Sequence, residues 1–101
     1  MNARTPLAEV PATFPAWYAE AEECLGLEGD FDAVGWYWVS EMLDPRDQGA
    51  FVAPHTIILI PQAISSRLVV KHEMVHHILN LHGITAHWEH NHWGFLECAG
   101  G

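Results

Sequence analysis

Histidine is concentrated in the last third of this chain, in a pattern that suits metal chemistry. The sequence contains eight histidines, and seven of them fall between residues 72 and 92. Imidazole is the commonest side-chain ligand for transition metals and a frequent general acid or base. Two of these histidines belong to the segment His72-Glu73-Met74-Val75-His76, in which they stand four residues apart. This segment is therefore the first candidate for a functional site.

The four-residue spacing has a physical meaning if the segment is helical. Residues four apart lie on one face of an α-helix, so the imidazoles of His72 and His76 can reach a single metal ion. Glu73 is rotated by about 100° from His72, which leaves its carboxylate close to the ion without making it a ligand. Zinc acidifies a coordinated water molecule, and a neighbouring carboxylate can accept the proton. The pattern thus predicts a zinc site with Glu73 as general base.

Apolar residues around the motif predict the helix that it requires. From about Ala63 to His82 they recur on nearly every side, as in a helix buried over most of its surface, and Gly83 is a natural C-terminal stop. Burying two imidazoles and a carboxylate without partners is costly. We therefore expect this helix at the centre of the domain with a metal between its histidines, rather than a buried helix with two incidental histidines.

The rest of the chain predicts a first helix and two irregular ends. A helix is expected over residues 13–25, capped by Thr13 and ended by Gly26. Residues 1–12 are rich in Pro and Ala without periodicity and predict a loose lead-in. Residues 84–101 predict an irregular, histidine-rich tail.

About three short strands are expected between the two helices, which makes the fold class α+β. They are predicted at residues 34–40, 51–53 and 55–60. Pro61 stops the last one, because proline cannot continue a ladder of hydrogen bonds. In the first strand Trp36 and Trp38 share one face, a pattern that favours packing against a helix over a ligand platform.

Length, composition and charge bound the function. At 101 residues, with 50% hydrophobic and 17% charged residues, the chain is expected to form one globular domain over 1–101. Thirteen acidic residues against four basic ones give a net charge of -9, which argues against nucleic acid and anionic membranes as partners. No apolar run approaches the ~20 residues that span a bilayer. The first residues lack the apolar stretch of a signal peptide, so we leave the compartment open between the cytoplasm and secretion after removal of a leader.

The two cysteines, Cys24 and Cys98, allow two interpretations. One is a disulfide that ties the first helix to the tail, and the other is a pair of buried free thiols. The sequence does not choose between them.

The flanks of the motif resemble those of the zincin metallopeptidases. The longer signature of that family has uncharged residues at the positions held here by Val69, Val70, Met74, Val75, His77 and Ile78. The resemblance covers roughly residues 54–98 and extends to a tail with His, Phe and Cys, which is similar to those of SprT-like and other minimal zincins. It implies a small zinc peptidase acting on peptide or protein substrates. It also implies that the strand at 55–60 is the sheet edge that aligns the substrate.

A catalytic zinc needs a third protein ligand, which the sequence leaves open. The candidates in the tail are His87, Glu89, His90, His92 and Glu97. In the minimal zincins that this tail resembles, the third histidine is closely followed by a Phe. Phe95 follows His90 by five residues and His92 by three, and we favour His90.

Two other arrangements compete with the tail histidines. His82 has the spacing of the metzincins, but Leu79 stands where that group has the glycine that turns the chain. A continuing helix would carry His82 about 80° round and about 15 Å along from His72, so we expect a surface or capping histidine there. Glu89 or Glu97 would instead resemble the gluzincins and would require a second helix.

The predicted function is therefore hydrolysis of peptide bonds, with Zn²⁺ on His72, His76 and His90 and with Glu73 as general base and acid. The alternative is a non-catalytic zinc- or nickel-binding module, in which the histidine-rich tail closes the site with a fourth side chain. A peptidase also needs a group that stabilises the oxyanion. The candidates for that role are Tyr18, Tyr37, His55, His77, His87 and His92.

Overall fold

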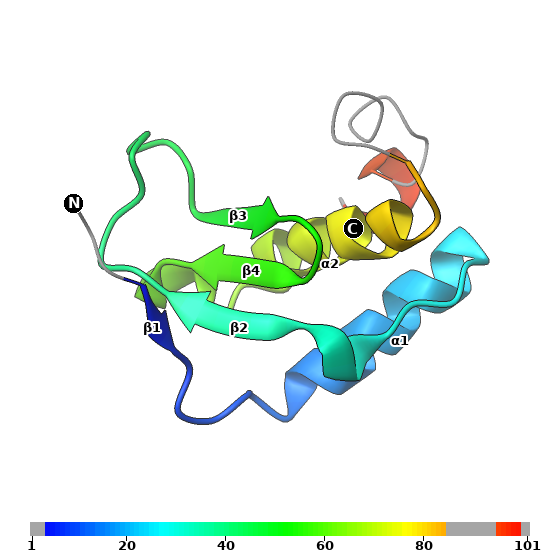
Figure 1. Cartoon of the computed structure of the whole chain (residues 1–101), viewed down its shortest axis with the longest axis horizontal. Coiled ribbons are helices and arrows are strands. Elements are labelled where there is room, and N and C mark those ends of the chain that lie inside the picture. Colours follow the sequence, from blue (N-terminus) through cyan, green and yellow to red (C-terminus); the bar gives the residue numbers. More distant parts are fainter. Residues whose placement is uncertain (1–3, 85–94, 100–101) are drawn as a thin grey trace.

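A four-stranded mixed sheet forms one layer of the fold, and two α-helices pack on it (Figure 1). The computed structural model describes residues 4–84 and 95–99 of the chain. The strands are β1 (Thr5–Pro6), β2 (Gly35–Trp38), β3 (Gly49–Val52) and β4 (Thr56–Leu59). The helices are α1 (Thr13–Leu25) and α2 (Arg67–Leu81), with short 3₁₀ turns at Phe31–Ala33 and Pro61–Ala63. The α+β class predicted from the sequence is confirmed.

The strand order β1-β2-β4-β3 decides which strand lies at the edge. β4 is parallel to β2 on one side and antiparallel to β3 on the other, so both of its edges are used. The expectation that residues 55–60 form the sheet edge is therefore wrong: that segment is interior, and β3 occupies the edge. The physical reason is the parallel pairing of β2 with β4, which joins segments far apart in sequence and leaves the hairpin partner β3 outside.

The lead-in expected to be loose contributes a strand. Thr5 and Pro6 pair antiparallel with Trp38 and Tyr37 of β2, and the backbone N–H of Leu7 donates to the carbonyl of Trp36 at 2.9 Å. A proline is tolerated there because β1 is an edge strand and needs no further donor. The sheet thus has four strands rather than about three.

Helix α1 owes its orientation to an apolar stripe. Phe14, Tyr18, Ala21 and Leu25 are buried and recur at spacings of three and four. Gly26 ends the helix in the left-handed conformation, φ 68°, as predicted. The predicted cap at Thr13 is wrong: Ala12 holds the cap position without a side-chain hydrogen bond, because the preceding turn closes through the N–H of Phe14 on Pro11.

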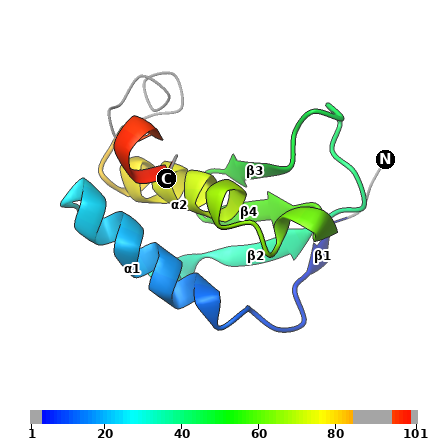
Figure 2. The ribbon, with the colours of Figure 1, turned by 180° about the vertical axis from the view of Figure 1, so that it is seen from behind.

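Helix α2 runs through the middle of the molecule, behind the sheet in Figure 1 and in front of it in Figure 2. It begins later than expected, since Pro61–Ala63 form a 3₁₀ turn and Ser66 then caps α2 by accepting from the N–H of Val69 at 3.3 Å. Its buried apolar residues meet those of α1 and of the inner face of the sheet. The shared core includes Phe14, Trp36, Ile57, Leu59, Val70, Met74, Val75, Ile78 and Leu79.

The first tryptophan of β2 belongs to this core, as predicted. Trp36 is 6% exposed, and its ring centroid lies 4.6 Å from that of Phe14. Trp38, which the sequence placed on the same face, is only half-buried.

A disulfide joins the end of α1 to the tail. Cys24 bonds to Cys98, so of the two interpretations of the cysteines the disulfide is confirmed. Cys98 lies in a single π-helical turn, η3 (Phe95–Ala99), which packs against α2 and α1 and is red in Figure 2. This part of the tail, expected to be irregular, is therefore helical, while residues 85–94 lie outside the described part of the chain.

Across residues 4–84 and 95–99 no helix combines the length and the apolar character that a bilayer crossing requires.

Candidate metal centre

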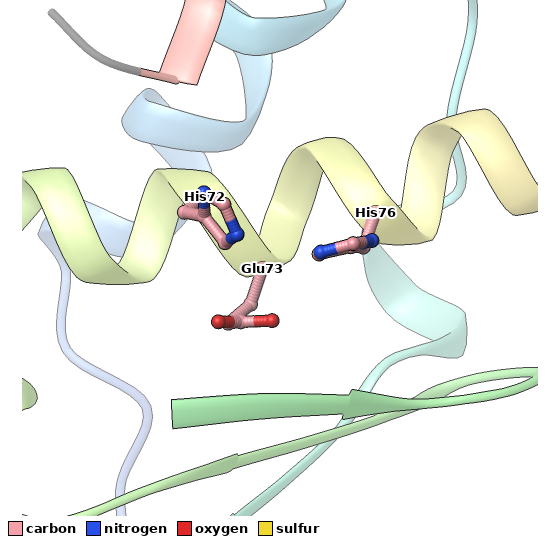
Figure 3. A group of neighbouring side chains, drawn as sticks. All are labelled: His72, Glu73 and His76. Atoms are coloured by element: carbon pink, nitrogen blue, oxygen red, sulfur yellow. The ribbon is translucent and has the colours of Figure 1, made fainter. Parts of the chain in front are cut away.

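Helix α2 brings the three motif residues together on the side that faces the edge strand. His72 is half-buried, whereas Glu73 and His76 are buried, with exposed fractions of 6% and 8%. Figure 3 shows both imidazoles projecting from successive turns, with the Glu73 carboxylate pointing toward a strand of the sheet. The four-residue spacing therefore has the consequence expected from helical geometry.

The donor atoms are close enough to share one ion. One nitrogen of each imidazole and one carboxylate oxygen all lie within 4.8 Å of one another. The rings of His72 and His76 have centroids 5.0 Å apart at an interplanar angle of 74°. Zinc binds nitrogen and oxygen at about 2.0–2.2 Å in tetrahedral geometry, so two donors on one ion stand about 3.4 Å apart. The group could therefore hold one ion, and within the described residues it is the one such group of three.

The edge strand packs directly against the motif. The ring of Phe51 in β3 lies parallel to that of His76, at 4° and 6.0 Å between centroids, and is T-shaped to His77 at 6.0 Å. At the other end of β3 a Cβ on Gly49 would meet Cγ1 of Val69 at 3.3 Å and a methyl of Leu59 at 3.0 Å. Glycine at this position lets the strand approach α2 closely, and the strand thus forms one wall beside Glu73 (Figure 3).

The start of α2 is tied to α1 by charge. Glu20 accepts from Arg67 at 2.7 Å and from the buried Lys71 at 3.3 Å. These two cations, Arg67 first, lower the pKa of Glu20 below its ordinary value. The contacts sit on the turn that carries His72 and hold that turn against the first helix.

His77, next to His76 in sequence, belongs to a different set of contacts. It is fully buried, and its Nδ1 lies 2.8 Å from the hydroxyl of Tyr18 while its Nε2 lies 3.0 Å from Nδ1 of His55. The Tyr18 oxygen also accepts from the backbone N–H of Asp30 at 3.0 Å. Burial lowers the pKa of His77 to about 4, with a smaller contribution from His55, and raises the pKa of Tyr18 to about 12. Three of the six oxyanion candidates, Tyr18, His55 and His77, are thus joined in one chain of hydrogen bonds.

The remaining phenol lies elsewhere. The ring of Tyr37 in β2 is covered by the guanidinium of Arg4, whose carbon is 5.3 Å from the ring centroid. The Tyr18 hydroxyl is already engaged by His77 and Asp30.

The candidates for a third ligand fall into two sets. His82 stands at the cap position after α2, exposed, where its Nε2 donates to the carbonyl of Glu28 at 2.7 Å, and it does not join the group. Glu97 is exposed on η3 and likewise stands outside the group. His87, Glu89, His90 and His92 lie outside the described residues.

Sequence reasoning missed the contacts around the motif rather than the motif itself. The stacking of Phe51 on His76 and the link from Tyr18 through His77 to His55 had no local pattern. One signal was present: a histidine on an apolar helix face must find partners once buried.

Comparison of the chain with protein-family models, with curated proteins and with solved structures finds no match. Fold and site together define a small α+β protein in which His72, Glu73 and His76 could hold a metal ion.

Proposed function

We propose that this chain is a zinc-dependent peptidase of the minimal zincin type. His72 and His76 would hold the ion, with His90 as the third ligand favoured by the resemblance of the tail. The observation that supports this most strongly is the convergence of two imidazoles and one carboxylate within 4.8 Å, on a buried helix beside a sheet edge. Nitrogen and oxygen donors in this set suit zinc.

Zn²⁺ held there would supply Lewis-acid chemistry, polarising a peptide carbonyl and making a water molecule more acidic. Glu73 supplies the proton transfers in this proposal. Its residue is 6% exposed, and its carboxylate points between the helix and the sheet. Glu73 would take a proton from the attacking water and deliver it to the nitrogen of the leaving amine.

The substrate would lie along β3. Among the described strands β3 pairs with β4 alone, so the backbone groups on its other edge can pair with an extended peptide. Its four residues, Gly49–Val52, span about 13 Å. The strand runs alongside α2, with Gly49 next to Val69 and Phe51 next to His76. A peptide added to this edge would pass the three-residue group, and β3 thereby takes the role that the resemblance assigned to residues 55–60.

Glu73→Gln tests the proposal, because glutamine keeps the shape of the side chain but cannot take a proton. Wild type and variant would be loaded with zinc, and cleavage of fluorescein-labelled casein would be measured beside zinc content. We expect equal zinc and a loss of turnover of about 100-fold or more. Turnover retained in Glu73→Gln would refute the role of Glu73. Zinc bound at one per chain without turnover in the wild type would favour the closed metal-binding module instead.

A further inference from the structure

Phe51, the third residue of the edge strand, meets the candidate metal centre through its ring. That ring lies parallel to the imidazole of His76, with an interplanar angle of 4° and centroids 6.0 Å apart. The ring of His72 meets the same imidazole at 74°, in a T-shaped arrangement with centroids 5.0 Å apart. His76 therefore has a parallel aromatic neighbour on β3 and a second ring, set across its own, one turn back on α2.

The pleat of β3 places Phe51 on the side of α2. Alternate residues of a strand point to opposite faces, so Gly49 and Phe51 share one face and Val52 belongs to the other. Phe51 is paired with Ile57 of β4, which is fully buried, whereas Val52 is 43% exposed. The sheet itself thus directs the ring of Phe51 toward the helix that carries the metal-binding motif.

Gly49 brings this face of the strand close to the helix. A Cβ at Gly49 would lie 3.3 Å from Cγ1 of Val69, so β3 approaches α2 as closely as a glycine permits. Two residues further along the strand, the half-buried ring of Phe51 lies against the part of α2 that carries His76. It also meets His77 at 61°, with centroids 6.0 Å apart. The ring is therefore packed between the strand and the helix.

The plane of a histidine ring decides where its metal-binding nitrogen points. The lone pair of an imidazole nitrogen lies in the ring plane, so rotation about χ2 swings the donor away from an ion. This torsion has broad minima in histidine and selects no plane sharply, and ligand histidines are usually oriented by neighbouring groups. An aromatic ring parallel to His76 opposes rotation of the imidazole, because a turned ring would lose the stacked contact or press into Phe51.

We propose that Phe51 is a positioning residue for the metal centre, whose ring fixes the plane of the His76 imidazole and so prepares it to bind an ion together with His72. This inference rests on the metal site of the proposed function and not on peptide hydrolysis. Aromatic pairs of this kind are worth about twofold to tenfold in an equilibrium constant. Metal affinity thereby depends on β3, the strand along which the substrate is proposed to lie.

Zinc affinity, measured in competition with a chromophoric chelator, gives the first test. In Phe51→Leu, which keeps an apolar side chain but removes the flat ring, we expect zinc to bind about twofold to tenfold more weakly. Phe51→Met, a second variant without a ring, should behave in the same way. Phe51→Tyr keeps the ring and should bind zinc as the wild type does. Val52→Ala, on the opposite face of β3, is the control and should leave the affinity unchanged.

Cobalt(II) in place of zinc gives a readout that a loss of stability alone does not move. Zinc is d¹⁰ and has no visible d–d bands, whereas the bands of Co²⁺ respond to the angles at its ligands. We expect these bands to shift in Phe51→Leu and to match the wild type in Phe51→Tyr. Phe14→Leu removes a fully buried ring that packs against Trp36 in the core. It should lower stability and leave the cobalt spectrum unchanged.

The outcomes separate this inference from the proposed function. Equal zinc affinity and equal cobalt spectra in wild type and Phe51→Leu overturn the role of Phe51 while leaving the metal centre intact. The same spectral shift in Phe14→Leu also overturns it, because the shift would then follow stability rather than the contact with His76. A wild type that binds neither zinc nor cobalt overturns the metal centre and this inference together.

Discussion

His76 and His77 are neighbours in sequence and belong to two different environments on the same helix. His76 stands with His72 and Glu73 beside the edge strand, where their donor atoms lie within 4.8 Å. His77 points to α1 and to the turn before β4, and both of its ring nitrogens are engaged. One helical step of about 100° therefore separates a histidine whose group could hold a metal ion from one whose ring nitrogens link α2 to α1 and to the turn before β4. The difference shows that the residue type names a possible chemistry and that the partners decide which one is used.

The sharpest test of this contrast compares His76→Leu with His77→Leu. We expect His76→Leu to lower zinc affinity by more than about 100-fold, because it removes a ligand. Loss of a residue that only hydrogen-bonds to a ligand typically costs about 10- to 100-fold. We expect His77→Leu to change zinc affinity little and to lower the free energy of unfolding by about 1–3 kcal/mol, because the hydroxyl of Tyr18 loses its acceptor. Zinc titration and urea melts measure the two quantities. Equal losses of zinc affinity would remove the distinction between the two histidines.

Reduction of the disulfide acts on both environments, because η3 packs against α2 and α1 alike. Cys24 and Cys98 are 74 residues apart, and closing a loop of this length stabilises the folded state by about 4 kcal/mol. We expect a reducing agent to lower the unfolding free energy in urea melts by that amount. The variant Cys24→Ala/Cys98→Ala is the control, since the agent should not affect it. An unchanged wild type would show that the bond contributes nothing to stability.

Acid should act on the His77 side of the helix in the metal-free protein. The pKa of His77 is about 4 when folded and has an ordinary value of about 6.5, so the unfolded chain takes up the proton first. Stability from neutral His77 is complete above about pH 6.5 and is lost as the pH falls toward 4, by up to about 3 kcal/mol. Thermal melts across this range should show a shallower decline for His77→Leu than for wild type. Parallel curves would contradict the assignment.

The smallest expected effect comes from the start of the hydrogen-bond chain. Tyr18→Phe removes one hydroxyl and leaves the ring in the core, where it packs edge-on against Phe31 at 5.4 Å. We expect a loss of about 1 kcal/mol in unfolding free energy and an unchanged zinc affinity. Leu43, which is fully exposed, offers a matched surface control in Leu43→Ala, with little change in either quantity. A large fall in zinc affinity for Tyr18→Phe would show that the two environments are coupled.

The parts of the fold that local pattern decides were predictable from the sequence. Gly26 ends α1, the apolar residues define α2, and the spacing of His72 and His76 places both on one face of α2. These features depend on residues within a few positions of one another, which is the range over which helical periodicity operates.

Features that depend on distant pairing were not predictable in the same way. β1 forms because Thr5 and Pro6 meet β2, and β3 lies at the edge because β4 pairs parallel with β2. The contact between Tyr18 and His77 joins residues 59 positions apart. No periodicity encodes such pairings, because each depends on how the completed layers meet. His90, the third zinc ligand favoured by the resemblance of the tail, stays a prediction, because it lies outside the described residues.

Zinc content per chain, measured by elemental analysis of tag-free protein after gel filtration, tests the central claim most directly. We expect one zinc per wild-type chain, and none in His72→Leu/His76→Leu. His82→Gln, which alters an exposed histidine outside the group, should retain the ion. A wild-type protein that holds no zinc after incubation with the metal, or a double variant that binds it equally well, would contradict the assignment of these two histidines.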